Sequence, residues 1–126
     1  MIESAGMRYR PLWLVLGFGL ALAVLVLSLL PIQKLPSVPT WDKLNHLIAY
    51  ASLMAWFGQL FPARRVGVAI ACVAFGVMIE ILQPIVSNRY FEVGDIAANA
   101  IGAALGWLAM ATPLRNVIAW FDAKLP

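Results

Sequence analysis

Charged residues are scarce in this chain. Only 12% of its 126 residues are charged, whereas 63% are hydrophobic and the mean hydropathy is +0.86. A soluble domain carries about 25% charged residues, which cover its water-facing surface. The composition therefore excludes an ordinary soluble domain and predicts an all-α polytopic membrane protein.

Cysteine and histidine each occur once, as Cys72 and His46. A single cysteine cannot form an internal disulfide, and neither residue belongs to a motif with metal-ligand spacing. We therefore expect Cys72 to be a small buried hydrophobic residue, and we predict no cofactor and no metal. The net charge of +3 lies beside apolar segments, so it favours contact with membrane lipids rather than with nucleic acid.

Four apolar segments are long enough to cross a bilayer, which takes about 20 helical residues. The first is longer than the apolar core of a signal peptide, so we expect it to be retained. The predicted spans are residues 12–30, 41–61, 66–86 and 95–111, all within one domain over residues 1–126. Residues 114–125 are predicted to form a short helix in the membrane interface.

Three further details of these helices can be predicted. Thr40 is expected to be the N-cap of the second span, with Asp42 in its first turn. Ala98, Gly102 and Gly106 recur at four-residue intervals, which favours close contact with another helix. The tail is amphipathic, and its apolar stripe consists of Leu114, Val117, Ile118, Phe121 and Leu125.

The lysines and arginines predict the orientation. With the N-terminus inside, Lys34, Lys43 and Arg89 lie outside, and the other six of the nine basic residues lie inside. Cytoplasmic loops carry the excess of Lys and Arg, so both termini are expected in the cytoplasm. The inner residues are Arg8, Arg10, Arg64, Arg65, Arg115 and Lys124.

Polar residues recur within the spans toward the predicted outer side. Asp42, His46 and Tyr50 are four residues apart and share one helical face. Glu80 lies deep in an apolar segment, where a carboxylate facing lipid would cost at least a few kcal/mol, so we expect it to face a wet interior. Pro84 lacks an N–H group and leaves the Glu80 carbonyl without its helical donor. The predicted outward-facing pocket is lined by Asp42, Lys43, His46, Tyr50, Glu80, Gln83, Arg89, Asp95 and Asn99.

The order of these residues resembles the VanZ-like family of small bacterial membrane proteins. The matching motifs are Asp-Lys-x-x-His-x-x-x-Tyr from Asp42, Glu-x-x-Gln from Glu80, and Arg-x-x-x-x-x-Asp-x-x-x-Asn-x-x-Gly from Arg89. One departure is Glu92, where the family often has aspartate. The resemblance implies a role in the cell envelope, at the outer face of the cytoplasmic membrane, and a link to resistance against the glycopeptide teicoplanin. It names no reaction.

The leading functional hypothesis is a protein that binds or modifies an amphiphilic ligand, either a lipid-linked wall precursor or a lipoglycopeptide such as teicoplanin. Lys43 and Arg89 would meet phosphate or carboxylate at the rim of the pocket. His46, Glu80 and Asn99 would hold the polar head deeper.

Two alternatives stay open. In a membrane-embedded hydrolase or transferase, His46 would act as base or nucleophile, with Glu80 or Asp95 orienting it. The same three side chains would offer a metal one nitrogen and several oxygens, which select no particular ion. In a small transporter or structural scaffold, the polar residues would only join helices, and Asp95 would be an ordinary N-cap.

Overall fold

The computed structural model describes residues 6–30, 39–86 and 91–126, with residues 39–42 described as backbone only. The described chain is helical throughout its regular structure, so the all-α prediction is confirmed for this part of the chain. The elements are α1 (Arg10–Leu29), α2 (Pro39–Leu60), η2 (Pro62–Arg64), α3 (Arg65–Val86), α4 (Val93–Ala109), η3 (Pro113–Asn116) and α5 (Val117–Lys124).

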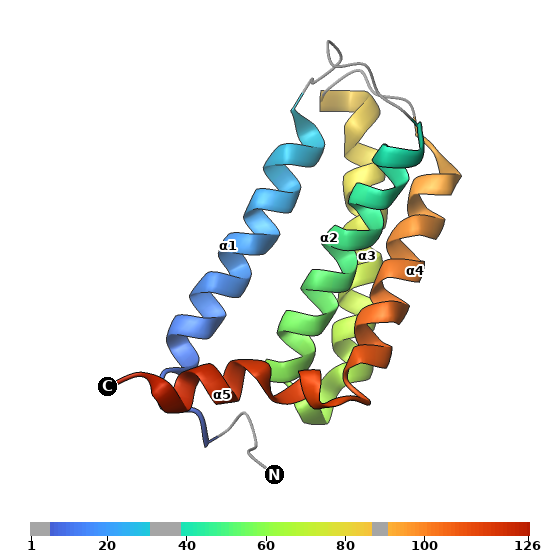
Figure 1. The fold of residues 1–126 in the computed structure, drawn as a ribbon. Helices are drawn as coiled ribbons and strands as arrows, with labels where there is room; N and C mark the ends of the chain where they lie inside the picture. The colour runs from blue at the N-terminus through green and yellow to red at the C-terminus, as the bar shows by residue number, and fades with distance from the viewer. Residues whose placement is uncertain (1–5, 31–38, 87–90) are drawn as a thin grey trace.

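The four long helices form a bundle, and α5 lies across one end of it (Figure 1). The start of α1 and the C-terminus lie at the end with α5, which we name the basic end. At the opposite end, named the polar end, α1 and α3 finish and α2 and α4 begin. Helix α2 contacts the other three long helices and packs most extensively against α4.

Length and hydropathy support two membrane-crossing helices among the described residues, namely Arg10–Leu29 and Pro62–Val86. A third is possible by this criterion if Val93–Ala109 and Pro113–Lys124, which are bent by 80° relative to each other, count as one span. The prediction of four spans is thus supported only in part. The physical reasons are the polar residues along α2, including Lys43, and the length of α4, which is 17 residues.

Two glycines of α4 allow its close contact with α2. A Cβ atom at Gly102 would lie 2.4 Å from the carbonyl oxygen of Leu47, and one at Gly106 would lie 2.6 Å from that of Ala51. Both distances are far below van der Waals contact, so only glycine fits without a shift of the backbone. The small-residue face predicted from the spacing is therefore the face that α4 turns to α2.

The interior contains small side chains and a few larger ones such as Tyr50 and Met54, while many large apolar side chains cover the outside. Cys72 packs with Tyr50, Leu53, Met54 and Ala103 in one buried cluster, as expected of a small hydrophobic residue. Outward side chains such as Phe18, Val66 and Leu108 are more than 60% exposed. Exposed apolar area on this scale is typical of a surface that faces lipid.

One predicted helix detail is wrong, and one alternative that was left open is excluded. Helix α2 begins at Pro39, so Thr40 is a helical residue and not the N-cap. Proline suits a first helical position because its missing N–H has no acceptor there. Asp95 is likewise not an N-cap: Glu92 takes that position in α4, and Asp95 lies in the first turn. Helix α3 continues past Pro84 to Val86.

The tail forms η3 and α5, but its buried face differs from the predicted one. Ile118, assigned to the outward apolar stripe, is 3% exposed, and Asp122, assigned to the polar side, is 7% exposed. The other stripe residues are exposed. Residues of α1 and α2 require this rotation, because they form hydrogen bonds with the Ile118 amide and the Asp122 carboxylate.

Candidate functional site

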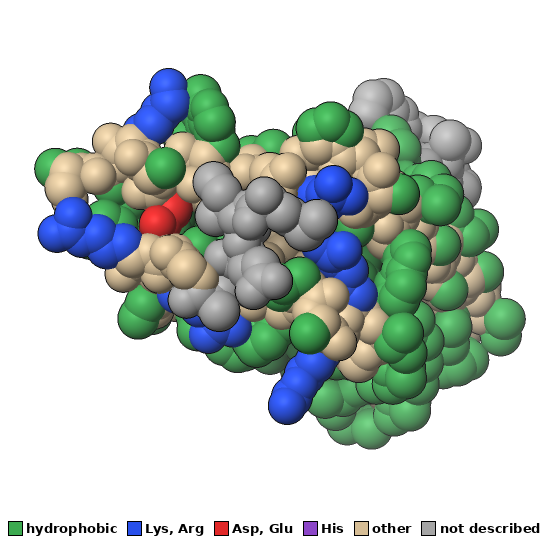
Figure 2. Space-filling view, turned by 90° about the horizontal axis from the view of Figure 1, so that it is seen from below, with side chains coloured by type: hydrophobic (Ala, Val, Ile, Leu, Met, Phe, Trp, Pro, Cys, Tyr) green, Lys and Arg blue, Asp and Glu red, His purple; other side chains and the backbone are tan. Residues whose placement is uncertain are grey.

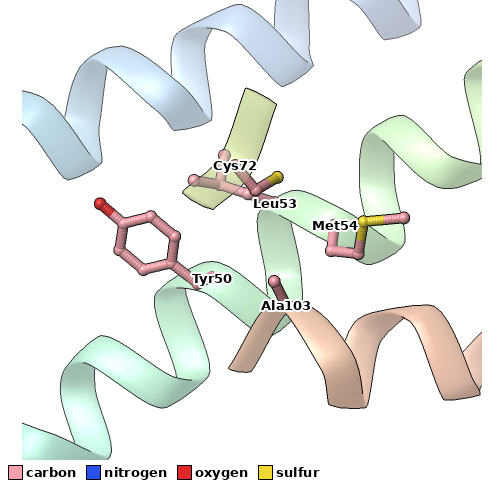
Figure 3. Close-up of a cluster of buried hydrophobic side chains, with 5 residues drawn as sticks. All are labelled: Tyr50, Leu53, Met54, Cys72 and Ala103. Atoms are coloured by element: carbon pink, nitrogen blue, oxygen red, sulfur yellow. The ribbon is translucent and has the colours of Figure 1, made fainter. Parts of the chain in front are cut away.

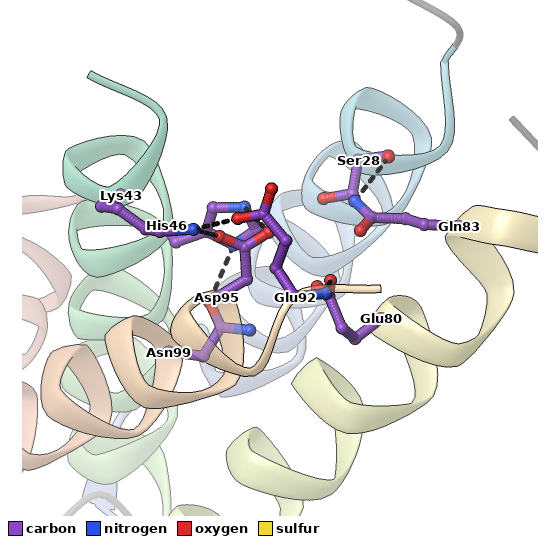
Figure 4. A network of polar contacts seen from close by, with 8 residues as sticks. All are labelled: Ser28, Lys43, His46, Glu80, Gln83, Glu92, Asp95 and Asn99. Carbon is purple, nitrogen blue, oxygen red and sulfur yellow. Dashed lines mark hydrogen bonds and ion pairs between the residues drawn. The ribbon is translucent and has the colours of Figure 1, made fainter. Parts of the chain in front are cut away.

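Polar side chains from all four long helices meet at the polar end (Figure 4). They lie in the last turns of α1 and α3, in the first turns of α2 and α4, and just before α4. We name this group the polar cluster. Its members are Ser28, Lys43, His46, Glu80, Gln83, Glu92, Asp95 and Asn99.

Lys43 lies at the centre of an ion-pair network. Its Nζ contacts the carboxylate of Asp95 and, at 2.5 Å, that of Glu92. The Asp95 side chain is 3% exposed, whereas that of Glu92 is 55% exposed. A buried carboxylate stays ionised only with a cation or hydrogen-bond donors beside it. Lys43 is therefore the required partner of Asp95, while Glu92 can exchange its contact with Lys43 for water.

His46 connects α2 to α4. Its Nδ1 lies 2.9 Å from Asn99 Oδ1, and its Nε2 lies 3.7 Å from Asp95 Oδ2. An amide oxygen only accepts, so Nδ1–H donates to Asn99 in this arrangement. The other ring nitrogen is turned toward the carboxylate. The buried imidazole is thus held between an amide and a charged group, and Asp95 links it to Lys43.

Glu80 and Gln83 bind backbone groups of neighbouring segments. Glu80 Oε1 accepts a hydrogen bond of 2.8 Å from the amide of Glu92, which is the N-cap of α4. Gln83 Nε2 donates a hydrogen bond of 3.0 Å to the carbonyl of Ser28, near the end of α1. Both side chains are at most 1% exposed. They therefore fix how α3 meets α4 and α1 at the polar end.

Tyr50 lies in the apolar interior, next to the polar cluster but not part of its hydrogen-bond and ion-pair network. Its side chain is 1% exposed, and its hydroxyl points away from Leu53, Met54, Cys72 and Ala103 (Figure 3). No hydrogen bond joins this hydroxyl to another residue in the described segments. The structure thus places the predicted site residue Tyr50 in the bundle core.

Gly76 provides the space for the deep side of the polar cluster. A Cβ atom at this position would lie 2.8 Å from Asn99 Nδ2 and 3.1 Å from Tyr50 Cε1. The glycine therefore lets Asn99 and Tyr50 approach the backbone of α3. A methyl group here would push Asn99 away and disturb its hydrogen bond with His46.

Two predicted site residues cannot be placed. Arg89 and the side chain of Asp42 lie outside the described part of the chain. Within the described part, no group of three His, Cys, Asp or Glu side chains lies close enough together to hold a metal ion. The metal variant with His46, Glu80 and Asp95 thus has no geometric support among these residues.

Sequence reasoning left the role of one member of the polar cluster open and missed a second polar site. Glu92 differs from the family pattern, yet its carboxylate contacts Lys43 and its amide contacts Glu80. At the basic end, Gln59 Oε1 accepts from the amide of Ile118 at 2.9 Å. A glutamine within an apolar segment, as at position 59, was the available signal for this contact.

Asp122 at the basic end forms the N-terminal cap of α1, which sequence reasoning also missed. Its carboxylate accepts hydrogen bonds of 2.9 Å from the amides of Arg8 and Tyr9 and one of 2.7 Å from the indole of Trp13. Burial alone would raise the pKa of Asp122, but these donors outweigh it and hold the pKa below its usual 3.8. Asp122 therefore attaches α5 to the start of α1.

The chain was compared with known proteins in three ways. Neither the comparison with curated proteins nor that with solved structures gave a match. The VanZ/LLP1 family model matches residues 11–114, which include all four long helices except the first residue of α1. This match covers most of the chain and confirms the resemblance read from the motifs. The chain belongs to the VanZ/LLP1 family of proteins.

Proposed function

We propose that this protein crosses the bacterial cytoplasmic membrane four times, with both termini in the cytoplasm. The long helices have 20, 22, 22 and 17 residues. At a rise of 1.5 Å per residue they are about 25–33 Å long, which suits a hydrocarbon core of about 30 Å. The six basic residues predicted to be inside all belong to segments at the basic end. These features support an outward-facing polar end.

The polar cluster, in this proposal, binds the polar head of an amphiphile that lies in the outer leaflet. The observation that carries it is the Lys43–Asp95–His46–Asn99 chain, a connected set of charged and neutral hydrogen-bonding groups at one end of an apolar bundle. Polar groups within membrane helices are costly and mark sites of function. An amphiphile matches both the polar cluster and the apolar helix surfaces beside it.

Lys43 supplies the cation for an acidic group of the ligand. In the structure two carboxylates already contact its ammonium group. Glu92 is the more exposed of the two, so a ligand phosphate or carboxylate can replace it while Asp95 keeps its contact. His46 and Asn99 then offer neutral hydrogen-bonding groups deeper in the bundle.

The family membership supports a choice of ligand class. Membership in VanZ/LLP1 supports a link to glycopeptide resistance, and teicoplanin is a glycopeptide with a lipid tail. A lipid-linked wall precursor has the same division into a polar head and a hydrocarbon tail. We therefore propose one of these two amphiphiles as the ligand.

The test is growth of a sensitive bacterium that expresses the wild type, His46→Ala or Glu80→Gln, in the presence of teicoplanin or vancomycin. Immunoblots of membranes check that the three proteins are equally abundant. We expect the wild type to protect selectively against teicoplanin and both variants to lose that protection. Protection by all three would make the polar cluster structural, and protection by none would separate this protein from glycopeptide resistance.

One observation favours a second candidate, an enzyme acting on a lipid-linked phosphate or ester. His46 Nε2, the ring nitrogen that stays unprotonated when Nδ1–H donates to Asn99, lies 3.7 Å from Asp95, and a nearby carboxylate can stabilise the imidazolium that forms when a general base takes up a proton. The distance is longer than a hydrogen bond, so the binding function is the one we favour. Turnover of a lipid-linked substrate that His46→Ala abolishes, with binding retained, would establish the enzyme instead.

A further inference from the structure

At the basic end, basic side chains outnumber the acidic side chains that could neutralise them. Figure 2 looks onto this end and shows lysine and arginine side chains at several places around it. Among the described residues, Asp122 is the only acidic side chain at this end. Its carboxylate is directed at the start of α1. The basic side chains are Arg8, Arg10, Arg64, Arg65, Arg115 and Lys124.

Two of the arginines stabilise the end of α2. Arg10 donates a hydrogen bond of 3.0 Å to the carbonyl of Leu60, and Arg65 donates one of 3.0 Å to the carbonyl of Gly58. The last carbonyls of a helix have no partner within the helix, so these arginines act as its C-terminal cap. Their positive charge thus has a structural use.

Arg8, Arg64 and Lys124 are different, because they are exposed and none forms a close ion pair with a described residue; the Arg8 charge acts on Asp122 only by helping to lower its pKa. They lie on three segments that hydrogen bonds hold together. The amide of Arg8 donates to Asp122, and the amide of Ile118 at the start of α5 donates to Gln59 near the end of α2. The three cations therefore all lie at the basic end, with Arg8 just before α1, Arg64 in η2 and Lys124 at the end of α5.

Aromatic and apolar side chains lie beside these cations. Trp120 is 52% exposed and Phe121 is 50% exposed, and the Lys124 ammonium lies 3.9 Å from the centroid of the Trp120 ring. Exposed tryptophan next to lysine is typical of a helix at headgroup depth. The surface thus combines positive charge with groups that favour the membrane interface.

We propose that this surface, consisting of Arg8, Arg64, Lys124 and Trp120, is a binding site for the headgroups of anionic phospholipids. The positive charge of these side chains is complementary to the net negative charge of an anionic phospholipid headgroup. Each basic residue near an anionic membrane surface strengthens association about fivefold. Association with a zwitterionic headgroup is strengthened much less, because the positive ammonium group of that headgroup repels the basic side chains. The site is independent of the polar cluster, which lies at the other end of the bundle.

The experiment uses the full chain in vesicles of equal parts phosphatidylglycerol and phosphatidylcholine with identical acyl chains. The protein is extracted in mild detergent, and the lipids that copurify are quantified. The wild type is expected to retain phosphatidylglycerol at least about threefold over phosphatidylcholine. The triple variant Arg8→Gln, Arg64→Gln, Lys124→Gln is expected to retain the two lipids about equally. The matched control Ala63→Gln, Ala123→Gln, at exposed neutral positions beside Arg64 and Lys124, should keep the wild-type preference.

Equal retention of both lipids by the wild type would overturn the proposal, and so would an undiminished preference in the triple variant. Loss of preference in the alanine-to-glutamine control would show that the lost charge is not what selects the lipid, and it would also contradict the proposal. If the triple variant does not fold, the wild type is measured in 0.1 M and 1 M NaCl, where the screening length is about 10 Å and about 3 Å. The preference must then disappear at the higher salt concentration, and its persistence would refute an electrostatic site.

Discussion

At the scale of single residues, glycines decide how closely the helices of this bundle approach. Gly102 and Gly106 lie against backbone carbonyls of α2, and Gly76 lies under Asn99. In each place the atom that meets the glycine belongs to a backbone or to a side chain of the polar cluster. The interhelical distance and the polar cluster therefore depend on the absence of a few methyl groups.

Gly102→Ala tests this dependence. The added Cβ would meet the Leu47 carbonyl at 2.4 Å, so α4 must shift, and we expect a loss of stability of about 1–3 kcal/mol. The matched control is Gly67→Ala, because a Cβ there has no atom within 4 Å. The control should change stability by less than about 0.5 kcal/mol. Unfolding of the purified proteins in detergent measures both, and equal stability of the two variants would contradict the account.

Glu92→Gln tests the proposed exchange at Lys43. The substitution removes the exposed carboxylate that competes with a ligand for the ammonium group, while the Glu92 backbone amide can still donate to Glu80. We expect binding of an acidic amphiphile to strengthen by roughly twofold to fivefold, the range for one exposed ion pair. Titration of the wild type and the variant with the same ligand measures the ratio. Weaker binding by the variant would show that Glu92 contacts the ligand directly.

At the scale of elements, α5 is attached to the bundle at both of its ends. The Ile118 amide donates to Gln59, and Asp122 accepts from the amides of Arg8 and Tyr9 just before α1 and from the Trp13 indole within it. The short helix would be marginal alone, because eight residues provide few internal hydrogen bonds. These contacts explain why α5 turns Ile118 and Asp122 inward against the pattern of its apolar stripe.

Asp122→Ala should detach α5 from α1. Loss of an N-terminal cap costs about 0.5–2 kcal/mol, and we expect faster amide hydrogen exchange in α5 and in the first turn of α1. The neighbouring substitution Lys124→Gln removes no hydrogen bond with a described residue and should leave exchange unchanged. Unchanged exchange in Asp122→Ala would mean that packing alone holds α5.

The stability due to Asp122 should also depend on pH. Its folded-state pKa is lowered, so the ionised carboxylate stabilises the fold at pH values above the usual 3.8. This contribution is lost as the pH falls from that value through the lower folded-state pKa. Thermal midpoints measured from pH 7 to pH 2 should therefore converge for the wild type and Asp122→Asn at the acid end. A constant difference across this range would exclude the ionised carboxylate as its cause.

Much of the arrangement of elements could be predicted from the sequence. Apolar length and prolines predicted each long helix to within two residues at most ends, because chain turns need polar or proline-containing segments. The roles of Asp122 and Gln59 could not be predicted. Each depends on a partner more than 50 residues away in the sequence, and no local pattern indicates such contacts. The start of α2 was misplaced because a proline is compatible with a first helical residue.

Part of the candidate site could also be predicted from the sequence, because residue spacing shows which side chains share a helical face. His46, Asp95 and Asn99 were proposed together because four-residue spacing puts polar groups on one helical face, and the structure brings them together. Tyr50 follows the same spacing but lies one turn deeper, among apolar side chains. Spacing therefore identifies the face of a helix that carries polar residues, whereas the depth at which that face becomes apolar depends on the neighbouring helices.

At the scale of the whole molecule, the protein has two chemically different ends joined by an apolar bundle. The polar end contains the polar cluster, and the basic end contains the start of α1, the C-terminus and the exposed arginines (Figures 1 and 2). This polarity supports the proposed orientation, in which the basic end faces the cytoplasm and the polar cluster faces outward. The two proposed sites, one for an amphiphile and one for anionic lipid, then lie in opposite leaflets.

Labelling of single cysteines tests the orientation. In a Cys72→Ala background, Glu92→Cys and Lys124→Cys place one thiol at each end, both at exposed positions. A membrane-impermeant maleimide is added to cells whose cytoplasmic membrane is intact and whose outer layers let the reagent through. It should label position 92 and not position 124. Inverted membrane vesicles should give the reverse pattern. Labelling of both positions from the same side would rule out an odd number of crossings between them and contradict the proposed orientation.

The most direct test of the central claim is equilibrium binding of teicoplanin to the purified protein in nanodiscs, with vancomycin as the glycopeptide without a lipid tail. We predict saturable binding of teicoplanin that His46→Ala weakens at least about tenfold, whereas Gly67→Ala leaves it unchanged, and markedly weaker binding of vancomycin. Equal binding by the wild type and His46→Ala, with both proteins folded, would contradict the claim that the polar cluster holds the head of an amphiphile.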